Sequence, residues 1–457
     1  MSSLGFQRIY RAIMEAPGLA CERAFVDDDD AGPMDVQSAI TYETQRSIAS
    51  FPVIALSVAY ELELAGLIRL LEAARIPPRR ADRDDRHPFI LAGGPLTFSN
   101  PLPLAGLVDA VIVGEAETLM IEVVRVLEST RSRAEQLAAL ARIPHVFVPE
   151  YHGANLPSVA AVDDSLIPAW APIRTPHTEF SNMFLIETER GCSRGCKYCV
   201  MRRSTNGGMR IAPMEAIMER IPVDAKRVGL VGAAVSDHPK IVQMVNQLAD
   251  EGREVGLSSL RPDRLSDEFV GALKRAGYRT LTTAMDGTSE RVRETLERRA
   301  KQKHLLQCAE RARAHGMDRL KLYLMIGVPG ETDADVDECV AFTTEISKIV
   351  PVALGIAPFC SKRNTPLDKM PYAGIDLVNA RLDRLRRGLK GRADVRSTSA
   401  KWAWVEYVLA QGGEAEGLAV IEAVHQGGTF AAYKRAFGAL QLGPVKAKRQ
   451  LTIARAS

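Results

Sequence analysis

Apolar runs of strand length alternate with helical patterns through the first third of the chain. The apolar runs span residues 53–59, 89–92 and 110–113, and the helical patterns span residues 6–15, 62–74 and 117–129. Strands that are apolar on both faces and separated by helices are typical of a parallel sheet covered on both sides. The pattern predicts an α/β domain over residues 1–152, built on a Rossmann-like parallel sheet.

A second alternating region follows a proline-bearing linker at residues 153–177. Its apolar runs span residues 184–187, 227–231, 255–259, 280–284, 320–325 and 352–357, separated by helical patterns at 214–220, 240–250, 266–276, 289–297, 304–315 and 334–349. Six β–α units with right-handed crossovers predict a partial (β/α)6 barrel over residues 178–370. Chemistry in such barrels takes place at the C-terminal ends of the strands.

The pattern turns helical from about residue 372, which predicts a small α-helical extension over residues 371–443 and a basic tail at 444–457. No apolar run reaches the roughly 18 to 20 residues that span a bilayer. The first 17 residues lack the basic-then-apolar layout of a secretory signal. We therefore expect a cytoplasmic protein that does not insert into a membrane.

Charge and cysteine content narrow the function further. A net charge of +3 over 457 residues gives no argument for nucleic-acid binding, and the acidic run Asp27 to Asp30 is explained as a solvated loop. Seven cysteines in a chain of this length do not form a disulfide framework. Cys21, Cys308, Cys339 and Cys360 are scattered, and the other three lie within eight residues of one another.

The crowded cysteines, Cys192, Cys196 and Cys199, follow the first strand of the second region in a polar, glycine-bearing loop. Thiolates are the ligands of iron–sulfur clusters, and closely spaced cysteines can surround one cluster. Three ligands leave a fourth iron open, as catalysis requires. The alternative is a structural zinc with a fourth ligand from elsewhere, although zinc sites favour paired C-x2-C elements and no second pair exists here.

The C-x3-C-x2-C loop, with Tyr198 before its last cysteine, resembles the signature of the radical S-adenosylmethionine (SAM) superfamily. The resemblance covers roughly residues 184–366. It implies that the three cysteines hold a [4Fe–4S] cluster whose open iron is chelated by the amino and carboxylate groups of SAM. Reductive cleavage of SAM then yields methionine and a 5′-deoxyadenosyl radical, and the protein supplies orientation and exclusion of water.

Further landmarks of the superfamily fall in barrel order after each later strand. The SAM contacts that the resemblance implies are Tyr198, Gly232, Ser236, Ser259, Arg261, Asp286, Gly327 and Pro329. The segment around Gly232 lacks the common GGEP motif, and Asp286 occupies a position where relatives have Glu. Arg261 is placed to pair with the SAM carboxylate, with a strand-end salt bridge as the alternative. Gly327 to Thr332 resembles the G-x-P-G-E-T segment beside the adenine.

The first domain resembles the cobalamin-binding domain of class B radical SAM proteins, on Ala92-Gly93-Gly94-Pro95, Asn100-Pro101 and residues 111–117. The resemblance implies a corrin laid across the strand ends above the barrel mouth. Its implied contacts are Ser57, Tyr60, Glu61, Gly93, Gly94, Pro95, Gly114 and Glu115. The chain departs from that pattern in two ways, since it has no D-x-H-x-x-G motif and begins at a helix where relatives begin with a strand.

Three functions follow as hypotheses. The first is a cobalamin-dependent methyltransferase that acts on an unactivated carbon, with SAM, the cluster and cobalamin as cofactors. The second keeps the cluster and SAM but uses the first domain as a platform for another radical reaction. The third is a non-catalytic iron–sulfur or zinc protein. The enzyme hypotheses require an external electron donor such as flavodoxin or ferredoxin, and the small-molecule or peptide substrate, the oligomeric state and the role of Cys360 stay open.

Overall fold

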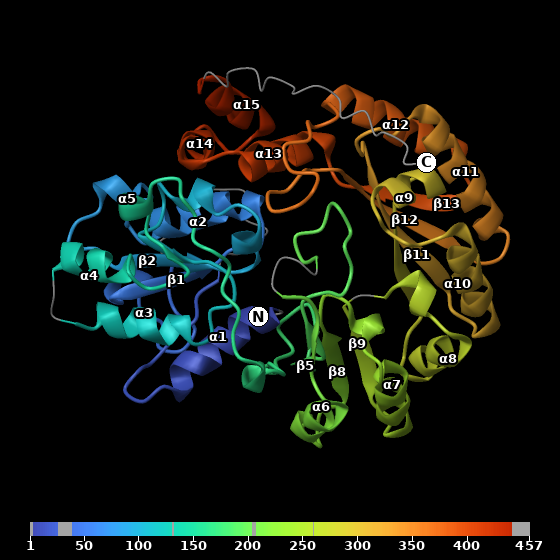
Figure 1. Ribbon diagram of the computed structural model, residues 1–457, viewed down its shortest axis with the longest axis horizontal. Coiled ribbons are helices and arrows are strands. Elements are labelled where there is room, and N and C mark those ends of the chain that lie inside the picture. The colour runs from blue at the N-terminus through green and yellow to red at the C-terminus, as the bar shows by residue number, and fades with distance from the viewer. Residues whose placement is uncertain (1–2, 26–38, 130–131, 203–206, 259, 441–457) are drawn as a thin grey trace, which may run out of the picture.

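The computed structural model describes residues 3–25, 39–129, 132–202, 207–258 and 260–440 (Figure 1). The Asp27 to Asp30 run, Ser259 and the predicted basic tail lie outside these described residues. No helix within the described ranges combines the length and the apolar character that crossing a bilayer would take.

The N-terminal region is a four-stranded sheet in the order β1-β2-β3-β4. Strands β1 (Val53–Ser57), β2 (Phe89–Gly93) and β3 (Ala110–Ile112) run parallel, and the short β4 (Val146–Phe147) pairs antiparallel to β3. The predicted parallel sheet is confirmed. Strand β4 was not predicted, because two residues are too few to show a period.

Alternation along the strands separates two hydrophobic layers. Ile90 and Ala92 of β2 face one layer, and Phe89 and Leu91 face the other. The second layer is closed by helices α1 (Leu4–Glu15), α3 (Leu119–Leu127) and α4 (Arg133–Leu140). The first layer contains α2 (Leu64–Ala73) and, from the far end of the chain, the C-terminal helices. Both faces of the sheet are therefore buried, as the apolar runs predicted.

The C-terminal helices α13 (Ala400–Gln411), α14 (Glu414–His425) and α15 (Phe430–Gly438) complete the core of the N-terminal sheet. Gly417 marks how closely they approach, since a Cβ there would lie 1.8 Å from the carbonyl oxygen of Pro103. Asn100 donates to the carbonyls of Ala410 (3.0 Å) and Gly412 (2.8 Å) at the end of α13. The predicted helical extension is thus present, and its role is to cover the first domain (Figure 1).

The barrel region consists of parallel strands in two adjoining sheets. The strands are β5 (Met183–Glu187), β8 (Arg227–Val231), β9 (Glu254–Leu257), β10 (Thr280–Asp286), β11 (Arg319–Ile326), β12 (Val352–Pro358) and β13 (Ala393–Ser397). The predicted partial barrel is confirmed. Strand β13, which pairs parallel to β12, corrects the expectation that the chain is entirely helical after residue 372.

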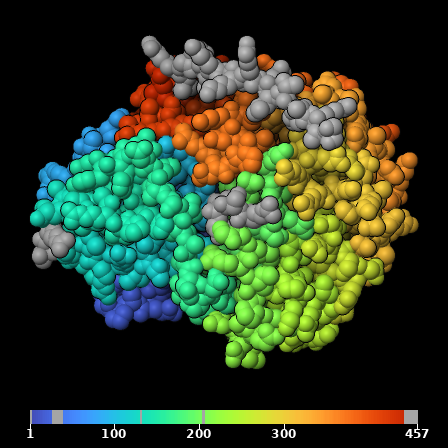
Figure 2. Space-filling view, in the orientation of Figure 1, coloured from blue at the N-terminus to red at the C-terminus, as the bar shows by residue number. Residues whose placement is uncertain are grey.

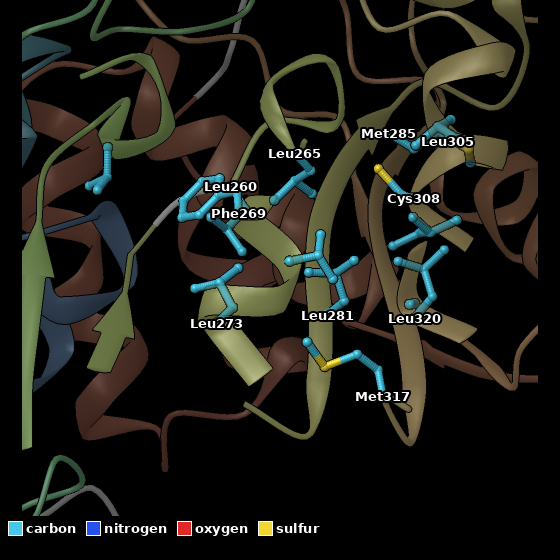
Figure 3. Close-up of a cluster of buried hydrophobic side chains, with 14 of the residues drawn as sticks. Leu260, Leu265, Phe269, Leu273, Leu281, Met285, Leu305, Cys308, Met317 and Leu320 are labelled. Atoms are coloured by element: carbon cyan, nitrogen blue, oxygen red, sulfur yellow. The ribbon is translucent and has the colours of Figure 1, made fainter. Parts of the chain in front are cut away.

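Helices cover the outside of the barrel strands. They are α6 (Met214–Arg220), α7 (Ile241–Asp250), α8 (Asp267–Arg275), α9 (Glu290–Thr295), α10 (Gln302–Ala314), α11 (Asp333–Ser347) and α12 (Ile375–Gly388). Figure 3 shows how α8 and α10 meet β10 and β11 through Phe269, Leu281 and Leu320. Cys308 lies fully buried in this layer, and Cys339 is equally buried in α11. Both cysteines serve as small core residues.

A buried ion-pair set joins the N-terminal sheet, the barrel and helix α13. The ammonium of Lys362, just after β12, lies 2.6 Å from a carboxylate oxygen of Glu61 and 2.7 Å from one of Glu406. Asn364, two residues further on, donates to the carbonyls of Phe98 (3.0 Å) and Ser99 (3.1 Å). In the space-filling view the C-terminal part of the chain, in red, lies at the upper side of the molecule against the N-terminal part (Figure 2). The segment after β12 therefore anchors the barrel to the N-terminal sheet.

Replacing Lys362 by Met removes the cation that lies between Glu61 and Glu406. Glu61 is only 1% exposed, so its carboxylate would be left buried without a counter-charge. We expect the free energy of unfolding to fall by about 3 kcal/mol. The midpoint of thermal unfolding measures the loss. Lys240→Met removes an exposed ion pair with Glu215 and is the matched control, with an expected change below about 0.5 kcal/mol. Equal midpoints for the two variants would contradict an anchoring role for Lys362.

Candidate active site

The cysteine loop begins at the mouth of the barrel, directly after β5. A short hairpin of β6 (Glu189–Arg190) and β7 (Arg210–Ile211) brackets the loop. Gly191 has φ +81°, a conformation that side chains with a Cβ rarely adopt, and turns the chain into the first cysteine. Cys196 is buried, at 7% exposure, and Cys192 and Cys199 are half-buried. The predicted ligands therefore lie at the carboxyl end of a barrel strand, where barrel chemistry is expected.

Charged side chains tie one flank of the loop to the ends of β8 and β9. Arg194 Nε lies 3.1 Å from Asp237 Oδ2, and Ser193 Oγ donates to the same oxygen at 3.2 Å. Arg261 lies 3.5 Å from Asp237 and 3.2 Å from Asp263. Asp237 therefore collects positive charge from both the cysteine loop and the loop after β9. This network orients the side of the loop that carries Cys192.

The other flank of the loop rests on β10, α9 and the segment after β11. Tyr198 packs against Val292, Leu296 and Val328 in a small hydrophobic cluster. The backbone N–H of Lys197 donates to the Leu296 carbonyl at 3.0 Å. Asp286 is ion-paired with the buried guanidinium of Arg298. The positive charge of Arg298 in turn lies beside the Cys196 thiol, so two residues that follow β10 reach the cluster ligands.

The three thiols have the environment that an iron–sulfur cluster requires. Burial raises the pKa of Cys192, and it raises the pKa of Cys199 to about 11, while repulsion from the Cys196 thiolate adds to both shifts. The three sulfurs are therefore close enough to affect one another. Without bound iron, burial favours the protonated thiols of Cys192 and Cys199, and iron binding must release those protons because thiolates are the ligands. Arg261 and Arg298 offset part of that negative charge.

A single-ion zinc site is not formed within the described part of the chain. No three His, Cys, Asp or Glu side chains among the described residues are arranged to hold one metal ion. Zn–S bonds of about 2.3 Å would require sulfurs within about 4 Å of one another. A cluster binds each thiolate to a different iron and accepts a wider spacing. The predicted ligands are three thiols in one loop, which is the kind of donor set that an iron–sulfur cluster uses.

Several of the predicted SAM residues lie in the loops that follow β8, β9 and β11. Ser236 Oγ accepts from the N–H of Arg261 at 3.0 Å, and the N–H of Gly232 donates to Ser258 Oγ at 3.1 Å, so the loops after β8 and β9 are joined. Gly327 turns the chain after β11 with φ +77°. The strand-end salt bridge considered for Arg261 is present. Asp286 is likewise paired within the protein.

A large cavity separates the N-terminal sheet from the cysteine loop. Its volume is about 1010 Å³. Of the predicted cobalamin contacts, Ser57, Gly93, Gly94, Pro95, Gly114 and Glu115 line it. Tyr60 and Glu61 lie outside the lining, Tyr60 exposed and Glu61 bound to Lys362. The opposite wall includes Glu189, Gly191, Met201 and Gly232.

Arg190 joins the two walls of the cavity through ion pairs. Its guanidinium lies 2.7 Å from Glu187 of β5, 2.7 Å from Glu117 and 3.3 Å from Glu115, the last two carried by the N-terminal domain. Arg210 of β7 is also paired with Glu115. Sequence reasoning did not assign this network. The available signal was a set of charged residues directly after the buried strands β3 and β5.

Glu189 is a second site residue that sequence reasoning missed. The carboxylate accepts from the N–H of Ala234 at 2.6 Å and lies so near Gly232 that a Cβ there would be 2.1 Å from it. Burial raises the pKa of the Glu189 carboxyl to about 8, and the charges of Glu187 and Asp237 contribute to the shift. A buried carboxylate beside the cluster loop is thus an unusual group in this site.

Comparisons with known proteins agree with this arrangement. The family described as "Radical SAM proteins, N-terminal" matches residues 5–149, and the radical SAM superfamily matches residues 186–343. The fold and the cysteine loop define an enzyme that holds an iron–sulfur cluster at a barrel mouth. The chain belongs to the radical SAM superfamily, whose cofactors are SAM and a [4Fe–4S] cluster.

Several curated proteins are similar to the chain. An uncharacterised protein of Methanocaldococcus jannaschii is 27% identical over 71% of this chain and 70% of its own length. The tRNA-2-methylthio-N(6)-dimethylallyladenosine synthase of Cereibacter sphaeroides is 27% identical over 44% of this chain. The ribosomal protein methylthiotransferase RimO of Geobacter sulfurreducens is 23% identical over 46% of this chain. The aligned region spans 48% and 49% of the last two relatives.

Among solved structures, the cobalamin-dependent SAM radical enzyme OxsB, with aqua-cobalamin and SAM bound, covers 74% of this chain with a TM-score of 0.45 and 11% identity. The match spans 48% of that chain.

Replacing Cys196 by Ala removes one of the three cluster ligands. We expect the anaerobically reconstituted variant to hold less than half of the wild-type iron and sulfide, with a matching loss of the charge-transfer absorbance. Cys308→Ala is the control, because Cys308 lies in the barrel core beside α8 and away from the loop. A Cys196→Ala variant with a full cluster would overturn the ligand assignment.

Replacing Glu189 by Gln tests the raised pKa of that carboxyl. A folded-state pKa near 8, above the unfolded value, means that the folded protein binds the extra proton. The stability contributed by this group is therefore complete below about pH 4 and is lost as the pH rises to 8. We expect the wild type to lose stability relative to Glu189→Gln over this range, by on the order of 1.4 kcal/mol per pH unit. Thermal midpoints of both proteins at several pH values measure the difference, which would stay constant if the pKa were ordinary.

Proposed function

We propose that this protein is a cobalamin-dependent radical SAM methyltransferase that acts on an unactivated carbon. The cluster, when bound, supplies the electron that cleaves SAM into methionine and a 5′-deoxyadenosyl radical. That radical would remove a hydrogen atom from the substrate carbon, and a corrin methylated by a second SAM would supply the methyl group to the substrate radical. The observation that carries the proposal is the cavity between the strand ends of the N-terminal sheet and the cysteine loop.

The size and walls of the cavity support a large, flat ligand. A volume of about 1010 Å³ lies at the upper end of the range for small-molecule sites. Gly93, Gly94 and Gly114 line one wall at the ends of β2 and β3, where open α/β sheets receive ligands. Gly94 and Gly114 also have positive φ, at +100° and +101°. A Cβ at Gly94 would lie 2.8 Å from the Val58 carbonyl oxygen, and one at Gly114 would lie 2.5 Å from the Ala160 nitrogen, so these glycines let neighbouring backbone pack closely at the cavity wall.

The two walls supply different parts of the reaction. Residues of the N-terminal sheet would bind the methyl carrier, and Cys192, Cys196 and Cys199 would hold the cluster that generates the radical. The Arg190 ion pairs hold these walls at a fixed separation. Gly191 and Met201, which flank the three cysteines, line the same cavity as the strand ends of the N-terminal sheet. A substrate placed there would lie between the loop that would hold the radical source and the domain that would bind the methyl donor.

Methyl transfer is favoured over methylthio transfer by the remaining cysteines. A methylthio group requires a sulfur source near SAM, and a second iron–sulfur cluster would need another converging set of thiols. Cys308 and Cys339 are fully buried in separate helices of the barrel. Cys21 lines the N-terminal wall of the cavity as a single thiol, and Cys360 lies after β12, where its thiol donates to the Ala403 carbonyl. We therefore attribute the similarity to the methylthiotransferases named above to the part of the chain that generates the radical.

An external one-electron donor, such as flavodoxin or ferredoxin, belongs to the proposal. Reductive cleavage of SAM consumes one electron in each turnover. Among the described residues, the remaining cysteines are scattered and do not form the ligand set of a second cluster that could pass electrons to the first. We therefore assign the electron to a separate donor protein.

Binding of hydroxocobalamin tests the proposal. We expect the anaerobically reconstituted protein to retain corrin after desalting, as judged by its absorbance. Ser57→Trp places an indole at an exposed position of the cavity wall and should weaken corrin binding by roughly tenfold or more. Val223→Trp is the control, because Val223 is 95% exposed and lies away from the cavity.

The outcomes separate the remaining hypotheses. Loss of corrin in the wild type, with 5′-deoxyadenosine still formed under reducing conditions, would favour a radical SAM enzyme that works without cobalamin. Formation of S-adenosylhomocysteine together with 5′-deoxyadenosine would support methyl transfer. Absence of both products with a full cluster and candidate substrates present would contradict both enzyme hypotheses.

A further inference from the structure

Arg8 of helix α1 differs from every other buried arginine in the described part of the chain. The other buried arginines each form an ion pair with a carboxylate, and they are Arg83, Arg261, Arg293, Arg298 and Arg381. Arg8 is 7% exposed, and its side chain forms no ion pair or hydrogen bond with any described residue. A buried guanidinium without a counter-charge is costly, and an anion that arrives with a ligand would remove that cost.

The tip of the Arg8 side chain is open to the large cavity between the N-terminal sheet and the barrel. Arg8 is one of the residues that line this cavity. Its Nε is buried without a hydrogen-bond partner, whereas Nη1 and Nη2 keep accessible surface and are equally unpartnered within the described ranges. The terminal N–H donors of Arg8 are therefore available to a molecule in the cavity.

The carboxylates that line the same cavity have other partners. Glu115, Glu117 and Glu187 pair with Arg190, Glu128 pairs with Arg125, Glu22 accepts from Thr41 and Thr44, and Glu189 accepts from the N–H of Ala234. Of the two other arginines in the lining, Arg23 is paired with Glu43, and Arg190 holds the three glutamates named first. Arg8 is therefore the one arginine of the lining that has no counter-ion among the described residues.

Helix α1 holds Arg8 beside the barrel. Leu4, one helical turn before Arg8, packs in one hydrophobic cluster with Ala169. Arg11, about one turn after Arg8, donates to the carbonyl of Trp170 at 3.2 Å, and its guanidinium lies 3.8 Å from the centre of the Trp170 ring. The charges of Arg8 and Arg11 repel each other. The stretch of helix that carries Arg8 is thus fixed at both ends and carries a positive potential, which favours an anion.

The chemistry of the side chain restricts the ligand group that fits. A guanidinium is planar and presents its N–H donors in a fork that matches two oxygens of a carboxylate or a phosphate. The other side chains that α1 contributes to the lining include Leu4, Phe6, Ile9 and Ile13. A ligand that fits this wall would therefore combine an apolar body with one anionic group.

We infer that Arg8 is the anion-binding residue of the large cavity and pairs with a carboxylate or phosphate group of a molecule bound there. The inference rests on the proposed function, because it assigns a chemical class to an occupant of the same cavity. The oxyanion is carried either by the substrate or by the phosphodiester of the corrin, and both sources present the same oxygens to Arg8.

Titration with inorganic phosphate tests the assignment. The probe is added to the anaerobically reconstituted full chain at constant ionic strength, with SAM present to occupy the open iron, and calorimetry gives the dissociation constant. We expect Arg8→Met to bind phosphate at least roughly tenfold more weakly than the wild type. Arg11→Met is the matched control on the same helix, and it should change the affinity by less than about twofold, because its charge acts only at a distance.

Thermal unfolding separates ligand binding from a structural role. Arg8 has no described partner in the ligand-free protein, so Arg8→Met removes a buried charge and should leave the midpoint unchanged or raise it. A lower midpoint for Arg8→Met would contradict the assignment, because it would mean that Arg8 stabilises the fold. Absence of phosphate binding in the wild type, or an equal loss of affinity in Arg8→Met and Arg11→Met, would also overturn it.

Competing corrins distinguish the two sources of the oxyanion. Hydroxocobalamin contains a phosphodiester, and cobinamide is a corrin without one. Competition with phosphate by hydroxocobalamin alone would assign the oxyanion to the corrin, and competition by neither would assign it to the substrate. Competition by both would overturn the assignment, because it would mean that the corrin ring covers Arg8.

The inference and the proposed function fail in different ways. A wild type that retains no corrin but binds phosphate through Arg8 would contradict the proposed function and leave the anion site intact. A wild type that retains corrin but binds phosphate no better than Arg8→Met would overturn the anion site alone.

Discussion

Arg190 holds the two halves of this molecule together at the point where their chemistry meets. One guanidinium contacts Glu187 of the barrel and Glu115 and Glu117 of the N-terminal domain. Burying these charges costs desolvation energy that offsets most of their attraction. The network therefore fixes the relative position of the two halves more than it raises the free energy of unfolding. Arg190 also stands two residues before Cys192, so the same contact holds the cluster loop across the cavity from the strand ends of the N-terminal sheet.

Much of the fold was predictable because burial leaves a local signal. The runs that became β1, β2 and β3 are apolar on both faces, as strands covered from both sides must be. Strand β13 was missed because its sequence, Ala393–Ser397, alternates small and charged residues and contains no apolar run. The packing of α13 to α15 on the first domain could not be predicted from local sequence patterns either. It depends on contacts such as that of Gly417 with Pro103, between residues more than three hundred positions apart.

The residues of the candidate site also differ in whether the sequence carries a local signal for them. The cysteine loop could be singled out from the sequence because its spacing matches a chemical requirement, and its role as the ligand set of a cluster stays a prediction. The cavity-lining glycines were predictable because ligands gather at strand ends. Tyr60 and Glu61 were predicted to contact the ligand because they also follow a strand end. The chain after β1 turns both residues away from the cavity, and Glu61 forms an ion pair with Lys362. The importance of Arg190 and Glu189 comes from their burial and their partners, which a linear pattern of charged residues does not reveal.

The ion pairs also separate charged groups that shape the loop from groups free to meet a ligand. Arg261 and Asp286, both expected to contact SAM, already pair with Asp263 and Arg298. A ligand that recruited either one would have to exchange an existing ion pair, and the net gain would be small because one charged contact replaces another. The paired residues therefore keep the cysteine loop in its shape, because each of them already has a partner within the protein.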